Sequence, residues 1–330
     1  MQEKLLVTGS TGFIGTRLLR RLEREGAVVR VFLRPESDGA SSLDRFEVTR
    51  GRFDDPDALR RAVAGVDRIV HLAGITKARD EEEFDRGNVM PVHNLLDTLR
   101  AYNPGLKRFV YVSSLAAAGP ATDGTEGVRE SDEPHPVSAY GRSKLRAEQL
   151  CMEASVSLPV TIVRPPAVYG PGDRDVLQVF RMLSSGLLVL PGNPVKQRFS
   201  MIYVDDLVEG ILAAASSDRA AGRTYYLTSA QAWSWDDLIA AARPALGFAS
   251  LLRIALPKAL VYALGAAGGF IGKLGGKPPL INRDKALELV QDYWVCSPER
   301  AVLELGFSAS TPLAEGIAKT VAWYRQEGLL

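Results

Sequence analysis

The first half of the chain alternates short apolar runs with longer stretches in which apolar residues recur every three or four positions. Six apolar runs lie at residues 4–8, 28–34, 46–51, 67–74, 108–114 and 158–164. After the first run, Leu18, Leu19 and Leu22 recur at helical spacing before Gly26. Short apolar strands that alternate with helices are typical of a parallel sheet covered on both faces. The pattern therefore predicts an α/β fold built on a doubly wound parallel sheet.

The second half is less regular and is predicted to form a smaller region beside the sheet. Residues 165–172 hold three prolines and two glycines, which indicate a rigid exit from the sixth strand. A helix over 176–183, a strand over 199–203 and a strand over 223–228 are expected to follow. The boundaries are then residues 1–168 for the sheet domain, with 199–228 returning to it. Residues 169–198 and 229–330 form mainly the second region.

The stretch 251–276 contains an apolar run, residues 259–272, that begins after Lys258 and ends before Lys273. It is too short for a membrane-spanning helix, which needs about 20 apolar residues. Three interpretations stay open for this stretch. It is a buried helix, a mobile cover over an apolar substrate, or a helix that lies on a membrane surface, the last being the least favoured.

Charge and cysteine content exclude several classes of protein. The 40 basic and 39 acidic residues give a formal net charge of +1, which predicts no nucleic-acid-binding face. The two cysteines, Cys151 and Cys296, form no disulfide framework, and the three histidines have no metal-ligand spacing. The chain enters its first strand almost at once without a secretory signal pattern, so we expect a cytoplasmic protein without a metal site.

Glycines connect the first strand to the first helix. Gly9, Gly12 and Gly15 are three residues apart, which allows a sharp turn and a close approach to a pyrophosphate at the helix N-terminus. Between two such elements, this spacing predicts a dinucleotide-binding Rossmann domain. The other residues of the turn that we expect to contact the cofactor are Thr11, Phe13 and Ile14.

The end of the second strand bears on the choice of cofactor. A carboxylate at this place hydrogen-bonds the ribose 2′-hydroxyl of NAD. This chain has Leu33 and Arg34 instead, and a guanidinium suits a 2′-phosphate. We therefore expect NADP as the preferred cofactor, with NAD left open.

A tyrosine and a lysine four residues apart, Tyr140 and Lys144, fall on one face of a predicted helix. Each titrates near pH 10 when alone, and a nearby ammonium favours the phenolate. The sequence thus predicts that Lys144 lowers the pKa of Tyr140, which then exchanges a proton with a carbonyl or alcohol oxygen. Ser114 ends the fifth strand, and its hydroxyl is expected to hold the same oxygen.

These motifs, in this order, resemble those of the extended short-chain dehydrogenases/reductases of the epimerase/dehydratase and 3β-hydroxysteroid dehydrogenase type. The matching segments are Gly9 to Gly15, His71 to Gly74, Asn88, Tyr111 to Ser114, Tyr140 to Lys144, Arg164 to Pro166 and Tyr203 to Leu207. The resemblance implies that Ser114 is the catalytic serine, Tyr140 the acid/base and Lys144 the ribose-binding helper. It also implies a homodimer.

The resemblance extends to further cofactor contacts. The additional residues implied are Leu72, Ala73, Gly74, Asn88, Pro165, Val168, Arg52 and Phe53. Relatives commonly carry an aspartate where Arg52 stands. Either Asp54 or Asp55 takes the place of that aspartate, or Arg52 stacks on the adenine or reaches the 2′-phosphate. His71 is expected to be a packed strand-end residue.

An absence of arginine indicates the substrate class. Nucleotide-sugar members usually hold the diphosphate with an arginine near the last strand-helix unit, but residues 289–295 contain none. Arg198 and Arg283 are the remaining candidates. We therefore expect an NADP(H)-dependent oxidoreductase that interconverts a ketone and a secondary alcohol on an apolar, sterol-like or long-chain substrate. A nucleotide-sugar epimerase or dehydratase with tightly bound NAD, and a non-catalytic cofactor-binding subunit, stay open as alternatives.

Overall fold

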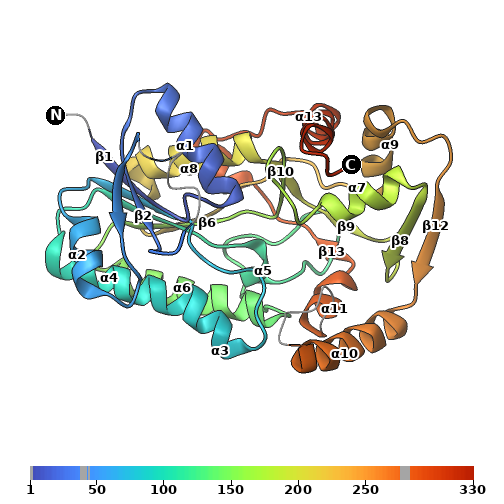
Figure 1. The fold of residues 1–330 in the computed structure, drawn as a ribbon, viewed down its shortest axis with the longest axis horizontal. Helices are drawn as coiled ribbons and strands as arrows, with labels where there is room; N and C mark the ends of the chain where they lie inside the picture. The colour runs from blue at the N-terminus through green and yellow to red at the C-terminus, as the bar shows by residue number, and fades with distance from the viewer. Residues whose placement is uncertain (1–2, 38–42, 44, 276–282) are drawn as a thin grey trace.

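The structure is a computed structural model that describes residues 3–37, 43, 45–275 and 283–330. Seven parallel strands form the central sheet, in the order β11-β6-β5-β4-β1-β2-β3 (Figure 1). They are β1 (Lys4–Thr8), β2 (Val28–Leu33), β3 (Glu47–Arg50), β4 (Arg68–His71), β5 (Arg108–Val112), β6 (Val160–Arg164) and β11 (Arg223–Tyr226). The doubly wound parallel sheet predicted from the apolar runs is confirmed.

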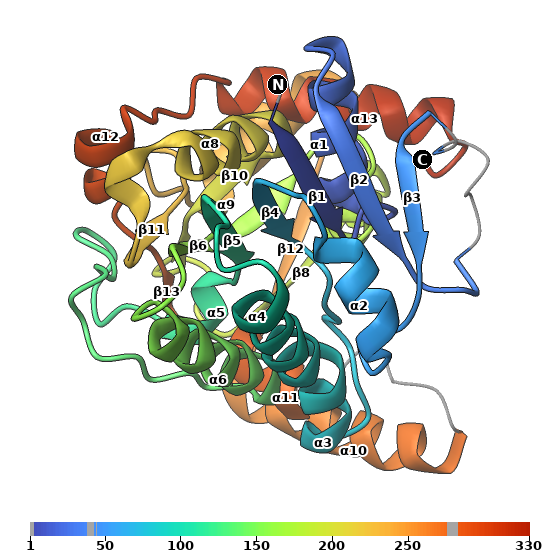
Figure 2. The same ribbon diagram turned by 90° about the vertical axis from the view of Figure 1, so that its left-hand side faces the viewer.

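Helices cover both faces of this sheet, which explains why its strands are apolar on both sides. One layer holds α1 (Phe13–Arg24), α8 (Val204–Ser216) and α12 (Glu299–Leu305). The opposite layer holds α2 (Pro56–Val63), α4 (Met90–Tyr102) and α6 (Ala139–Ala154) (Figure 2). Each layer packs a separate cluster of buried side chains against the sheet, around Leu18 and Ile211 on one side and Leu59 and Leu95 on the other.

The helical stretch before Tyr102 is interrupted by a π-helical turn. The spacing predicts one long helix from Glu81, and the structure has α3 (Glu81–Phe84), the π-helix η2 (Asp85–Val89) and α4 in direct succession. The wider turn coincides with the buried Asn88, whose side chain bonds the loop before α3. Single π-turns inside α-helices are frequent at functional sites.

The second region is built from three two-stranded parallel pairs and the helices around them. The pairs are β7 (Ala167–Tyr169) with β10 (Met201–Tyr203), β8 (Leu187–Pro191) with β12 (Leu252–Leu256), and β9 (Arg198–Phe199) with β13 (Tyr293–Trp294). The single strand expected over 199–203 is thus two strands with different partners. Helices α7 (Leu177–Ser184), α9 (Trp235–Leu246) and α13 (Leu313–Gln326) enclose a third buried cluster around Phe180 and Ile317.

The chain crosses between the two regions more than once. After β10, helix α8 packs on α1 and β11 pairs with β6 at the edge of the central sheet. Asp205 and Asp206 lie in the first turn of α8, whose N-cap is Tyr203. Arg17 of α1 donates from its Nε to Asp205 Oδ1 at 2.8 Å, and Thr311 N donates to Asp206 Oδ2 at 3.0 Å. These carboxylates therefore connect segments that are far apart in the sequence.

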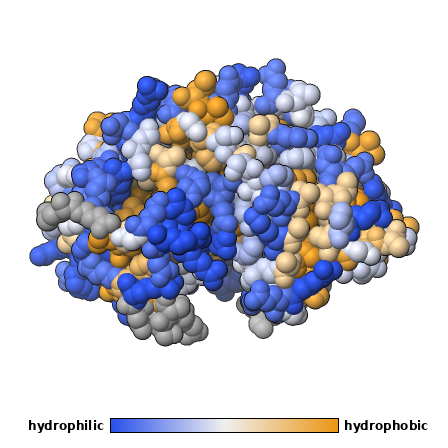
Figure 3. Space-filling model, turned by 90° about the horizontal axis from the view of Figure 1, so that it is seen from above, coloured by the Kyte–Doolittle hydropathy of each residue, from blue (hydrophilic) through white to orange (hydrophobic). Residues whose placement is uncertain are grey.

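The apolar stretch 251–276 lies at the outer edge of the second region. It forms β12 and then α10 (Lys258–Gly275), which packs on α11 (Arg283–Leu289). Leu252 and Ile254 of β12 are 63% and 41% exposed, and hydrophobic atoms are visible at this end of the molecule seen from above (Figure 3). Most described side chains of α10 are exposed, so the interpretation as a buried helix is wrong. Within the described residues, no helix combines the length and apolarity needed to cross a membrane.

Candidate active site

The glycine turn after β1 is shaped for close approach of a ligand. Gly9 has a φ of +70°, and a Cβ there would lie 2.7 Å from the backbone nitrogen of Ala73. A Cβ on Gly15 would lie 2.2 Å from the carbonyl oxygen of Gly9. Gly12 begins α1 without a side-chain cap, so the first amides of this helix face the turn. These residues fit the pyrophosphate of a dinucleotide.

The strand ends beside this turn carry the other predicted cofactor residues. Ile14, Leu72 and Val168 are half-buried and pack against the same core cluster. The carbonyl of Pro165 accepts a hydrogen bond from Leu115 N at 2.8 Å, which fixes the exit of β6. Ser10 Oγ is buried and lacks a hydrogen-bond partner among the described residues. Such an unsatisfied donor beside the glycine turn suits a polar ligand.

The adenine end is less tightly organised. Arg34 is exposed, as is Thr11 of the glycine turn, and Arg52 pairs with Glu36 at 3.5 Å and with Asp54 at 3.3 Å. Phe53 is half-buried, and its ring packs edge-on against Phe32 at 5.1 Å between ring centroids. The two basic side chains remain at the surface, where they are accessible to a phosphate.

His71 is a packed residue of β4, as predicted. Its side chain is fully buried, and Nδ1 lies 2.9 Å from Thr8 Oγ1. Burial lowers the pKa of His71 to about 3, so its ring is neutral.

Ser114 and Tyr140 meet where two helices begin. Ser114 is the N-cap of α5 (Leu115–Ala118), and its Oγ accepts from Ala116 N at 3.1 Å. The hydroxyl of Ser114 lies close enough to that of Tyr140 to lower the pKa of the tyrosine. A Cβ on Gly141 would lie 2.2 Å from the carbonyl oxygen of Ala116, so glycine is needed for this approach of α6 to α5. The structure thus brings together the serine and tyrosine that the sequence pairs.

Lys144 lies one turn further along α6 and is only 5% exposed. Its Nζ donates to the carbonyl of Val112 at 2.8 Å and sits 4.6 Å from the ring centroid of Tyr111. Burial lowers the pKa of Lys144 to about 8, while the nearby Glu148 carboxylate acts in the opposite direction. The ammonium is therefore held at the carboxyl end of β5, beside the candidate serine.

The predicted lowering of the Tyr140 pKa is wrong for this structure. Burial raises the pKa of Tyr140 to about 12, although the nearby Ser114 hydroxyl lowers it. The penalty for burying a phenolate exceeds the stabilisation from its neighbours. Tyr140 is consequently protonated near neutral pH, which is the form that donates a proton.

Replacing Lys144 with methionine is expected to stabilise the protein at pH 7. The shift of the pKa from 10.5 to about 8 means that the folded state bears a cost for the buried charge, on the order of 3 kcal/mol. Below pH 8 the lysine is charged in both the folded and unfolded states and the full cost is present. Between about pH 8 and 10.5 only the unfolded state stays protonated, so the advantage of Lys144→Met shrinks as the pH rises.

Urea unfolding at pH 7 and pH 10 measures this difference, with Lys196→Met, at an exposed lysine, as the control. An equal or lower unfolding free energy for Lys144→Met at pH 7 would contradict the expectation.

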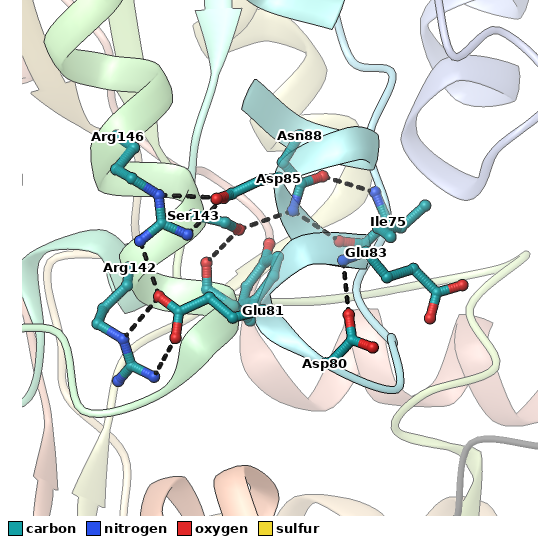
Figure 4. A network of polar contacts seen from close by, with 10 residues as sticks. Ile75, Asp80, Glu81, Glu83, Asp85, Asn88, Arg142, Ser143 and Arg146 are labelled. Carbon is teal, nitrogen blue, oxygen red and sulfur yellow. Dashed lines mark hydrogen bonds and ion pairs between the residues drawn. The ribbon is translucent and has the colours of Figure 1, made fainter. Parts of the chain in front are cut away.

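Asn88 connects the loop after β4 to α6 (Figure 4). Its Oδ1 accepts from Ile75 N at 2.8 Å, and its Nδ2 donates to Ile75 O at 3.1 Å and to Ser143 Oγ at 2.9 Å. Ser143 Oγ in turn donates to the carbonyl of Tyr140 at 2.8 Å. A Cβ on Gly74 would lie 2.9 Å from Asn88 Oδ1 and 3.9 Å from Lys144 Nζ. Asn88, predicted as a cofactor residue, therefore also positions the helix of Tyr140 and Lys144.

An ion-pair cluster fixes the same helix from outside. Arg142 donates from both Nε and Nη2 to the carboxylate of Glu81, at 3.2 and 3.1 Å. Arg146 Nη1 donates to Glu81 Oε1 at 2.8 Å and its Nε donates to Asp85 Oδ1 at 3.0 Å (Figure 4). The charge run at residues 81–83, which reads as a solvated face in the sequence, thus supplies one partner of this cluster.

Two contacts at Tyr140 are not foreseen from the sequence. Glu288 of α11 accepts from Ser138 Oγ at 2.6 Å, and Ser138 caps α6 by accepting from Gly141 N at 3.0 Å. The ring of Phe84 lies 5.9 Å from that of Tyr140, between ring centroids. Ser138 before the helix is a readable cap signal, but nothing local to Glu288 or Phe84 indicates that they reach it.

Metal coordination has no evident place in this site. Among the residues that the structure describes, no three or more His, Cys, Asp or Glu side chains converge as a metal site would require.

The chain is similar to known proteins in sequence and in fold. Residues 5–227 match the family described as NAD dependent epimerase/dehydratase. A ceramide reductase from Caulobacter vibrioides is 31% identical over 98% of this chain and 95% of its own. A dTDP-glucose 4,6-dehydratase from Streptomyces griseus is 30% identical over 99% of this chain and 95% of its own. The crystal structure of a protein named gox2253 has a TM-score of 0.80 at 27% identity, covering 100% of both chains. The chain therefore belongs to the NAD-dependent epimerase/dehydratase family, and it is an NAD(P)-dependent enzyme of the extended short-chain dehydrogenase/reductase type.

Proposed function

We propose that the protein is an NADP(H)-dependent reductase that converts a ketone on a long-chain or sterol-like lipid into a secondary alcohol. The observation that carries this proposal is the apolar setting of the proton donor. Tyr140 packs in a cluster with Ile75, Ala78, Phe84 and Ala139. Such surroundings favour an apolar group beside the carbonyl. The similarity to a protein named ceramide reductase supports the same class of substrate.

The proposed reaction assigns one task to each of three residues. A bound nicotinamide cofactor supplies the hydride that reduces the carbonyl carbon. Tyr140, protonated because burial raises its pKa to about 12, donates its phenolic proton to the carbonyl oxygen. Ser114, whose hydroxyl lies beside that of Tyr140, orients the same oxygen. The ammonium of Lys144 stabilises the phenolate that remains and is placed to bind the ribose.

A nucleotide-sugar substrate is the second candidate function, favoured by the similarity to a dTDP-glucose 4,6-dehydratase. Two arginines were candidates to hold its diphosphate. Arg198 Nη1 donates to the carbonyls of Val195 and Gln197, at 3.0 and 2.8 Å, so it is engaged within its own loop. Arg283 is exposed at the start of α11. Neither arginine is placed to hold a diphosphate, so a lipid ketone is the favoured substrate. A non-catalytic cofactor-binding role does not require Ser114, Tyr140 and Lys144 to lie together.

Turnover assays distinguish these functions. The purified protein is incubated with NADPH or NADH and either ketone analogues of ceramide, sterol ketones or dTDP-glucose, and cofactor oxidation and products are followed. Reduction of the lipid ketones with NADPH is expected. Conversion of dTDP-glucose with NAD released on denaturation would support the sugar function, and cofactor binding without any turnover would support the non-catalytic one.

Reversing the charge at Arg34 is expected to change the cofactor preference. Loss of one charge-assisted hydrogen bond to a 2′-phosphate costs about 1.5–3 kcal/mol, or roughly 10–100-fold in kcat/KM with NADPH. The carboxylate of Arg34→Glu would instead accept from the ribose hydroxyls and improve NADH use. Steady-state kinetics with both cofactors measure the ratio, with Arg24→Glu at the exposed end of α1 as the control. An unchanged NADPH/NADH ratio would remove Arg34 from the cofactor site.

A further inference from the structure

The solvent-facing side of helix α10 is apolar. Over residues 259–267 only Val261 and Gly265 are buried. Leu260, Tyr262 and Leu264 are 45%, 40% and 46% exposed. The remaining exposed positions are all alanines, namely Ala259, Ala263, Ala266 and Ala267. A surface helix normally presents charged or polar residues to water. We call the exposed side chains of residues 259–267 the α10 surface.

The stretch of sequence that holds this surface carries charges of one sign. Residues 258–279 contain three lysines and neither aspartate nor glutamate. Lys258 begins α10 and pairs with Asp292 at 3.1 Å. An apolar surface in a stretch of chain that carries only positive charges complements a bilayer with anionic head groups.

The dimensions of α10 fit a position in the plane of a bilayer. Its 18 residues correspond to a length of about 27 Å at about 1.5 Å per residue, less than the ~30 Å hydrocarbon core. Binding of a helix to a membrane surface strengthens with the apolar area that it buries among the acyl chains and with its attraction to anionic lipids. Figure 2 shows α10 at the lower edge of the molecule, beyond the helices that cover the sheet.

The α10 surface is also connected to the proton donor. The buried side of α10 packs on α11 through Val261, Ala286 and Val290. Glu288 of α11 accepts from Ser138 Oγ at 2.6 Å, and Ser138 caps the helix on which Tyr140 lies. The α10 surface therefore belongs to a pair of helices that contacts the start of the helix bearing Tyr140.

We propose that α10 binds the surface of a membrane containing anionic lipids, with Leu260, Tyr262 and Leu264 among the acyl chains, and that the enzyme takes its lipid substrate from that membrane. The second half of this statement rests on the proposed function, whereas membrane binding itself does not.

Co-sedimentation with vesicles tests the binding. The full-length protein is mixed with vesicles of phosphatidylglycerol and phosphatidylcholine, or of phosphatidylcholine alone. The wild type is expected to sediment with the anionic vesicles. Leu260→Glu/Leu264→Glu should weaken this binding at least about tenfold, because two carboxylates are placed in the acyl region. Val156→Glu/Leu303→Glu adds the same charges at positions 92% and 71% exposed elsewhere, and should bind as the wild type does. Melting temperatures verify that all three proteins are folded.

Several outcomes would overturn the proposal. A wild type that stays in the supernatant with both vesicles would do so, as would equal losses in the two double variants. A change in oligomeric mass for Leu260→Glu/Leu264→Glu, with vesicle binding intact, would assign the surface to a second copy of the chain. Reduction of a short, water-soluble ketone separates this test from the proposed function. Leu260→Glu/Leu264→Glu should reduce the soluble ketone as fast as the wild type does. If the wild type does not reduce it, the proposed function is refuted, whereas the conclusion from vesicle binding still stands.

Discussion

Replacing Tyr140 with phenylalanine is expected to lower kcat for ketone reduction by about 10²–10⁴-fold, the range typical for loss of a general acid. The hydroxyl is the only part removed, and the ring retains its packing against Phe84. Since the proposed cofactor contacts lie at the glycine turn and the strand ends, the dissociation constant for NADPH should remain nearly unchanged. Stopped-flow or steady-state reduction of a lipid ketone, with fluorescence titration of NADPH, measures both quantities.

Tyr111 offers a matched control for this variant. It is fully buried beside Lys144, and its hydroxyl has no hydrogen-bond partner among the described residues. Tyr111→Phe therefore removes the same group from the same neighbourhood without removing a proton donor, and kcat should stay close to that of the wild type. Equal losses in both variants, or full turnover by Tyr140→Phe, would rule out the proton-donor role.

The central sheet was predictable because its determinants are local. Each strand is a short apolar run in the sequence. The glycines after β1 predict a tight turn, and the structure has this turn, with Gly15 packed against the carbonyl of Gly9. The position of Ser114 at the carboxyl edge of the sheet also follows from the sequence, since parallel sheets place their binding residues at that edge. For these features, position in the chain determines position in space.

Features that depend on tertiary burial were not predictable in the same way. Spacing alone suggests that Lys144 lowers the pKa of Tyr140, but the pKa of an ionisable side chain depends on how much water the fold leaves around it. Burial raises the pKa of Tyr140 to about 12 instead. Likewise, residues 259–267 favour a buried helix when judged from the sequence, because an almost entirely apolar segment contains no polar side to orient it, yet most of these side chains are exposed.

Contacts between distant segments were equally hidden. Glu288 lies 150 positions from Ser138, and the pairing of these two residues requires the second region to fold back onto α6. Arg164 matches a family motif in the sequence, but the partner that neutralises it lies on α6. In both cases a single sequence shows the residue but not its partner.

Replacing Glu148 with alanine is expected to destabilise the protein by about 3–5 kcal/mol, the usual cost of removing one member of a buried ion pair and leaving the other charge unpaired. The side chains of Glu148 and Arg164 are 1% and 6% exposed. Arg164 Nε donates to Glu148 Oε1 at 2.9 Å and Nη2 donates to Oε2 at 2.6 Å, while Nη1 donates to Tyr226 OH at 2.9 Å. Without Glu148, Arg164 retains its charge inside the protein with only the tyrosine hydroxyl as a side-chain partner.

The comparison that isolates this effect uses two further variants in equilibrium urea unfolding. Glu153→Ala removes an exposed carboxylate from the same helix and should cost far less. Glu148→Met/Arg164→Met removes both charges, and it should regain most of the loss because well-packed apolar side chains can replace a buried pair. Removing Glu148 also withdraws the negative charge that favours protonated Lys144, so the pKa of Lys144 should fall below its present value of about 8. The alkaline limb of the activity profile of Glu148→Ala would then move to lower pH. If Glu148→Ala is no less stable than Glu153→Ala, the buried pair does not hold β6 against α6.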